Sequence, residues 1–125
     1  MKNTMINTLF SAIFITSLSF ASISAMAARD FYQEQLIQNI QLTKQKLQKA
    51  EAAKGKSQQA LIKEHSTMLH DNMLACSQMK PKAGMTEQER DEWFAEHQAI
   101  MHEIMSQMMQ KEALITSLTN CDTRK

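Results

Sequence analysis

Histidine and methionine recur together in one part of this chain, at spacings that suit metal binding. All four histidines and eight of the eleven methionines lie between His65 and Met109. Each histidine precedes a methionine by three or four residues, which places both side chains on one face of a helix. Imidazole and thioether groups are ligands for soft ions such as Cu(I) and Ag(I). The four pairs are His65/Met68, His70/Met73, His97/Met101 and His102/Met105.

The same residues also fit a purely structural interpretation. Methionine at helical spacing is an ordinary core residue, because its flexible side chain fills irregular gaps. On this interpretation His65 and His97 lie at the edge of a core, and His70 and His102 are solvated. The sequence alone leaves both interpretations open.

The composition predicts an all-α protein, because the residues that break helices are scarce. Only Gly55, Pro81 and Gly84 interrupt long runs of Ala, Gln, Lys, Glu, Leu and Met, which favour helix. The first two helices are expected over residues 30–54 and 58–79. We therefore expect a small helical hairpin or a bundle of three to four helices.

Capping signals mark where the expected helices meet. Gly55 is expected to end the first helix and Ser57 to cap the second. Thr86 and Glu89 form a capping box that starts a third helix, which then has no breaker before Asn120. A rod of roughly 50 Å exceeds what the other helices cover, so we expect it to bend, to break or to pack in a dimer.

Each expected helix carries one apolar stripe, and the stripes contain several of the His/Met residues. The stripe of the first helix holds Leu36, Ile40, Thr43, Leu47 and Ala50. That of the second holds Leu61, Ile62, His65, Met68, Leu69, Asn72, Cys76 and Met79, and that of the third holds Trp93, His97, Ile100, Met101, Ile104, Met108, Ile115 and Leu118.

Facing residues locate the main metal site that the sequence predicts. In a tight hairpin that turns at residues 81–85, the numbers of facing residues add up to about 166, so Met101 faces His65. The predicted site therefore consists of His65, Met68, His97 and Met101. His70, Met73, His102 and Met105 lie off the stripes and are expected to form weaker, exposed sites.

The N-terminus has the pattern of a secretory signal peptide. A basic Lys2 precedes a short apolar run, and Ala25-Met26-Ala27 fits a cleavage site. Residues 1–27 are therefore expected to be removed and residues 28–125 to form one periplasmic domain without a membrane span. The remaining chain has thirteen basic and thirteen acidic residues, a balance that argues against a nucleic-acid partner.

Two cysteines in an exported chain predict one disulfide, between Cys76 and Cys121. In a straight hairpin these residues would lie on the order of 45 Å apart, whereas a disulfide needs Cα atoms within about 7 Å. We expect an intramolecular bridge, for which the third helix must fold back near residues 104–109. A bridge between two protomers is the alternative.

Two resemblances follow from these motifs. The repeated His-x-x-Met spacing resembles the periplasmic SilE-type silver- and copper-binding proteins, which use such pairs as separate sites for soft metals. Residues 84–88, Gly-Met-Thr-Glu-Gln, resemble the L-T-x-x-Q motif of the CpxP/Spy group, with Met85 in place of the usual Leu. That group implies a helical hairpin dimer that acts as a chaperone or as a sensor of metal and envelope stress.

These observations favour a non-enzymatic protein. The sequence shows no nucleophile and base pattern, no phosphate-binding glycine loop and no C-x-x-C-H haem motif. We expect a periplasmic helical protein that binds Cu(I) or Ag(I), with no cofactor that it requires. The alternative is an interaction protein, such as an immunity protein, an inhibitor of a partner enzyme or an ATP-independent chaperone, in which His and Met only pack.

Overall fold

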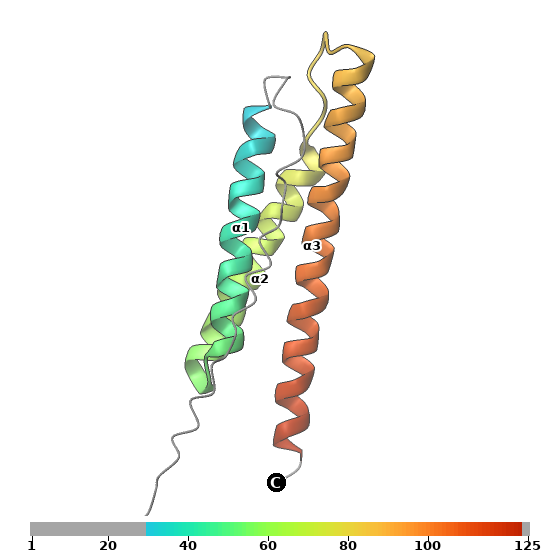
Figure 1. Cartoon of the computed structure of the whole chain (residues 1–125). Coiled ribbons are helices and arrows are strands. Elements are labelled where there is room, and N and C mark those ends of the chain that lie inside the picture. The colour runs from blue at the N-terminus through green and yellow to red at the C-terminus, as the bar shows by residue number, and fades with distance from the viewer. Residues whose placement is uncertain (1–29, 124–125) are drawn as a thin grey trace, which may run out of the picture.

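Three helices make up the part of the chain that the computed structural model describes, residues 30–123 (Figure 1). α1 spans Phe31–Ala52, α2 spans Gly55–Gln78 and α3 spans Glu87–Asp122, and no strand occurs among these residues. α1 and α2 form an antiparallel hairpin, and α3 runs back along it (Figure 1). The prediction of an all-α bundle is confirmed. The expected signal peptide, residues 1–27, lies outside the described residues.

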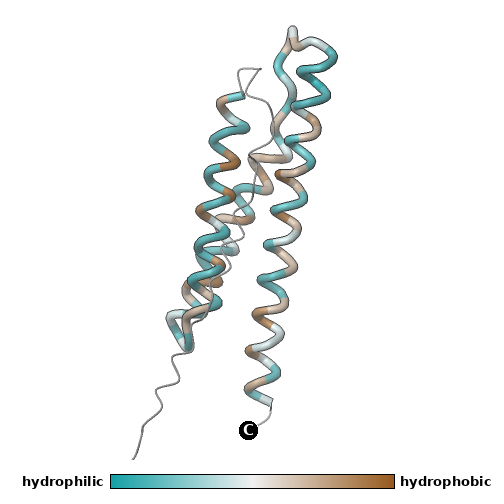
Figure 2. Tube along the Cα trace, in the orientation of Figure 1, coloured by the Kyte–Doolittle hydropathy of each residue, from teal (hydrophilic) through white to brown (hydrophobic). Residues whose placement is uncertain are grey.

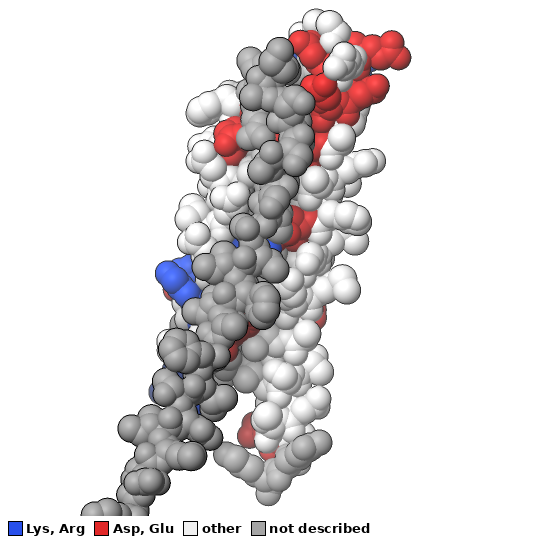
Figure 3. Space-filling view, in the orientation of Figure 1, with Lys and Arg blue, Asp and Glu red and all other residues white. Residues whose placement is uncertain are grey.

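The start of α3 is fixed by the predicted capping box. Thr86 Oγ1 accepts a hydrogen bond from Glu89 N at 3.2 Å, and Glu89 Oε2 accepts one from Thr86 N at 2.9 Å. Glu87 and Glu89 lie in the first turn, and Figure 3 shows acidic side chains gathered around this end of the helix. Their negative charge stabilises the positive end of the helix dipole.

The turn between α1 and α2 is confirmed at the predicted place, but its capping differs from the prediction. Gly55 is the first residue of α2 and has a φ of +65°, a conformation that glycine adopts without steric cost. Ser57 therefore lies inside the helix and is not its cap. Gln58 Nε2 instead donates a hydrogen bond of 2.9 Å to the carbonyl oxygen of Ala50, near the end of α1.

The apolar core is narrow, because each helix buries only one stripe. Figure 2 shows apolar positions recurring between hydrophilic ones along all three helices. The predicted stripe of α1 is confirmed, since its five residues are all buried. The central cluster consists of Leu36, Ile37, Ile40, Leu69, Cys76, Ile100 and Ile104.

A layer of buried polar side chains crosses this core. The side-chain amide of Gln107, on α3, donates hydrogen bonds to the carbonyl oxygen of Ile40 at 3.2 Å and to Glu103 Oε1 at 3.1 Å. Its Oε1 lies 3.2 Å from His65 Nε2 on α2. Glu103 also pairs with Lys44 Nζ of α1 at 3.3 Å. One amide thus connects all three helices.

α3 is longer than its partners and is covered over only part of its length. Its 36 residues form one unbroken helix of about 54 Å, so of the three expected alternatives (a bend, a break or packing in a dimer) the break does not occur. None of its described residues after Gln107 is fully buried. Within residues 30–123, no helix is long and apolar enough to cross a membrane.

Replacing Gln107 by Met should lower the free energy of unfolding by about 1 to 3 kcal/mol. Methionine has a similar shape but leaves the buried His65 Nε2–H without an acceptor. Urea unfolding followed by circular dichroism measures the change. Gln110→Met is the matched control, because Gln110 is exposed and bonds only Ser106, and it should change stability by less than about 0.5 kcal/mol. Equal losses in the two variants would contradict this role of Gln107.

Candidate metal centre

Two contacts fix the register between α2 and α3. His65 Nε2 lies 3.2 Å from Gln107 Oε1, and Cys76 Sγ lies 3.6 Å from His97 Nε2. The paired residue numbers add up to 172 and 173, so α3 is displaced along α2 by about seven residues, or about 10 Å, from the predicted tight hairpin. The displacement arises because residues 79–86 do not turn tightly: they rise beyond the end of α2 before α3 begins (Figure 1).

The surroundings of His65 suit a role in the packing of the core. It is fully buried. Because the amide nitrogen of Gln107 donates to two oxygens, its Oε1 is the acceptor, and His65 Nε2 carries the proton. Burial lowers the pKa of His65 below its usual value, although the hydrogen bond that His65 donates to Gln107 opposes this effect, and nearby Lys111 lowers the pKa further. Nε2 is therefore not free to bind a metal in this tautomer, and Nδ1, which has no hydrogen-bond partner, is buried away from an incoming ion.

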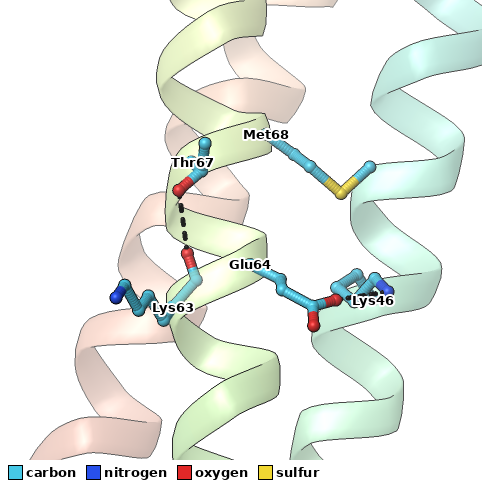
Figure 4. A pocket seen from close by; sticks show the side chains of 5 residues that line it. All are labelled: Lys46, Lys63, Glu64, Thr67 and Met68. Atoms are coloured by element: carbon cyan, nitrogen blue, oxygen red, sulfur yellow. Dashed lines mark hydrogen bonds and ion pairs between the residues drawn. The ribbon is translucent and has the colours of Figure 1, made fainter.

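Met68 lies about 60° around α2 from His65, on the side toward α1. It borders a shallow hollow of about 330 Å³ beside α1, which is lined by Lys46, Lys63, Glu64, Thr67 and Met68 (Figure 4). Its side chain points toward α1, next to the 2.7 Å ion pair between Lys46 and Glu64 (Figure 4). Lys46 is paired with Glu64, and Lys63 adds a further positive charge, so this hollow is unsuited to a cation.

His97 and Cys76 meet where α2 and α3 touch, near the C-terminal end of α2. Cys76 is buried in the core, and burial raises the pKa of its thiol. The ring of His97 stacks on the indole of Trp93, with centroids 4.7 Å apart and planes inclined by 13°. Burial lowers the pKa of His97, which favours the neutral imidazole that metals bind. His97 lies ten residues, or about 15 Å, along α3 from the level of His65.

Met73 and Met101 lie at one level along the bundle. Met73 precedes Cys76 by three residues on α2, and Met101 follows His97 by four on α3. Because the two helices are antiparallel, both steps go in the same direction, by about 4.5 Å and 6 Å. The exposed fractions are similar, at 41% for Met73 and 46% for Met101.

The two methionines also lie on the same outer edge of the α2–α3 pair. Around α2, Met73 lies about 60° from Cys76 and about 100° from Asn72, beyond Cys76 as seen from Asn72, which donates a hydrogen bond to Thr43 of α1. Met101 lies on the side of α3 away from Glu103, which pairs with Lys44 of α1. Both sulfurs are therefore carried on the edge that faces away from α1.

The predicted burial of Met101 is wrong. Its apolar stripe was expected to face the core, but the buried face of α3 includes three polar residues, Glu96, Glu103 and Gln107. Their inward position rotates Met101 toward solvent. Of the weaker predicted positions, His70, Met73, His102 and Met105 are all exposed, as expected.

The predicted intramolecular disulfide is wrong. Both cysteines are free in the structure, Cys76 buried and Cys121 exposed. Cys121 lies 24 residues beyond His97 on the unbroken α3, which places it about 36 Å along the bundle from Cys76. Because α3 does not fold back, the two sulfurs cannot approach.

The structure thus separates the four predicted ligands and brings His97 and Met101 together with two others. Cys76 and Met73 share their level. Cys76 was not predicted as a ligand, because its sulfur was expected to be part of a disulfide. Within residues 30–123, no three side chains among His, Cys, Asp and Glu form a group that could hold a metal ion, so a centre here needs methionine sulfur. Comparison with family models, curated proteins and solved structures finds no match to this chain.

Stability should fall as the pH drops below about 6.5, the usual pKa of histidine. The pKa of buried His65 is lowered in the folded state, so the unfolded chain binds more protons in this range and protonation favours unfolding. His65 alone contributes a slope of at most about 1.4 kcal/mol per pH unit. Urea unfolding between pH 7 and pH 5 should show a smaller slope for His65→Gln than for the unchanged protein. Equal slopes would contradict the lowered pKa.

Proposed function

We propose that this chain is a non-enzymatic protein that binds one soft metal ion, Cu(I) or Ag(I), at the outer edge between α2 and α3. The proposal rests on one observation: Met73 and Met101 lie at one level of this edge, half-exposed, beside the imidazole of His97. Thioether and imidazole ligands favour soft monovalent ions over Zn²⁺ or Mg²⁺. This set keeps His97 and Met101 from the predicted site and moves Met73 into it.

The expected export of the chain supports the same function. A signal peptide over residues 1–27 would deliver the protein to the periplasm, a compartment that must handle copper and silver. The half-exposed methionines leave the edge accessible to an incoming ion without opening of the core.

Replacing Met101 by Leu should weaken the binding of Cu(I) at least tenfold and leave the fold intact. Leucine keeps the volume and apolarity of methionine, so stability should change by less than about 1.5 kcal/mol, but it offers no sulfur. Titration against a competing Cu(I) chelator under reducing conditions measures the affinity. All proteins in this test carry Cys121→Ser, because an exposed thiol binds soft metals by itself.

Met68→Leu is the matched control for this experiment. It makes the same chemical change on α2, but on the side that faces α1 (Figure 4). Its affinity for Cu(I) should equal that of the Cys121→Ser parent. Failure of the parent to bind Cu(I) or Ag(I) at micromolar concentrations would overturn the proposed function.

Binding of a partner protein is the second candidate function, and exposed apolar residues along α3 favour it. Phe94, Met105 and Met109 are 47%, 56% and 71% exposed. Methionine-rich surfaces adapt to varied apolar segments, as a chaperone or an inhibitor requires. Leucine replaces methionine in such a contact but not as a metal ligand. Suppression of the aggregation of an unfolding protein that survives Met105→Leu and is lost in Met105→Lys would support this second function.

A further inference from the structure

Cys76 and His97 form a hydrogen-bond contact between a thiol and an imidazole, two ligands that soft metal ions prefer. The sulfur lies 3.6 Å from the ring nitrogen, within the range of a weak hydrogen bond to sulfur. The thiol is free and buried at the interface of α2 and α3. A metal ion that binds both atoms needs them near each other and on two different helices, as they are here.

The surroundings of the pair restrict its movement. Trp93 stacks against the His97 ring and sets the plane in which Nε2 points toward Cys76 Sγ. Cys76 packs in the apolar cluster with Leu69 and Ile100 and therefore has little rotational freedom. Two ligands held in place before the metal arrives lose less entropy on binding than two mobile surface side chains.

A soft ion between these atoms would reach further sulfur within one helical turn. Met73 and Met101 start from positions about 4.5 Å and 6 Å along the bundle, on the exposed edge. Methionine side chains are long and flexible, so their sulfurs can turn toward the pair. A thiolate, an imidazole and thioethers form a donor set that suits Cu(I) and Ag(I).

We infer that Cys76 is the principal ligand of this centre and binds Cu(I) or Ag(I) as a thiolate together with His97 Nε2. Met101 and Met73 supply thioether sulfur from the exposed edge. When the bond from sulfur to metal forms, the S–H bond breaks and its proton passes to the buffer, with no change of oxidation state. The inference rests on the proposed function and adds a ligand that the His/Met spacing does not indicate.

Substitution of Cys76 tests the inference in the Cys121→Ser background. Cys76→Ala should weaken binding of Ag(I) at least a hundredfold, because it removes the only charged ligand.

Metal-loaded parent protein should also show the near-ultraviolet charge-transfer absorption of a thiolate bound to Cu(I), and Met101→Leu should retain it. Parent protein that binds Cu(I) without this absorption overturns the role of Cys76 but leaves the proposed function standing. If folded Cys76→Ala binds Ag(I) as tightly as the parent protein, the role of Cys76 is likewise overturned and the proposed function stands.

The two natural cysteines allow a test that needs no substitution. One equivalent of Ag(I) should slow the alkylation of Cys76 by iodoacetamide at least tenfold, measured by peptide mass, while exposed Cys121 reacts at an unchanged rate. This test decides the matter if Cys76→Ala fails to fold. Protection of Cys121 in place of Cys76 overturns the inference. Absence of any binding overturns the proposed function and the inference together.

Discussion

The buried amide of Gln107 is the interaction on which the arrangement of the three helices depends. It joins His65 of α2, the backbone of α1 at Ile40 and, through Glu103, Lys44 of α1. An apolar stripe of Leu and Ile can slide by one turn at modest cost, because one branched side chain replaces another. A buried amide cannot, because each displaced donor or acceptor would lose its partner at a cost of about 1 to 3 kcal/mol. The polar layer therefore selects one register for a thin core.

That register is also what separates the predicted metal ligands. The connection from Met79 to Thr86 is extended at its start, and it carries the chain beyond α2 before the capping box begins α3. The first turns of α3 consequently project past the end of α2, and His97 comes to lie opposite Cys76. A tight turn at Pro81 would have placed Met101 opposite His65 instead. The chemistry at the α2–α3 edge thus follows from the length and shape of one connection.

The sequence predicts this fold well at the positions where the signal is local. The capping box at Thr86, the turn at Gly55 and the buried stripe of α1 each depend on residues close together in the chain. The site is predicted only in part, because it depends on contacts between helices. Hydropathy alone directs Met101 inward and Gln107 outward, whereas the hydrogen bonds of Gln107 reverse both. Cys76 was paired with Cys121 because small exported domains commonly carry a disulfide, although a straight hairpin already separates the two residues by on the order of 45 Å.

Gln107 is the last fully buried residue of α3, and it separates two segments of different local stability. Between Trp93 and Gln107, the backbone of α3 opens only if the polar layer and the core open with it. After Gln107, the turns from Met108 to Asp122 contain no fully buried residue, so hydrogen bonds within the helix and the partly buried Leu114, Ile115 and Leu118 hold them. Exchange of backbone amide hydrogens should therefore be fastest at Asp122 and slow progressively toward Gln107. Cys121 lies on the segment that frays first. Its thiol is therefore more mobile than the thiol of a cysteine on a rigid helix.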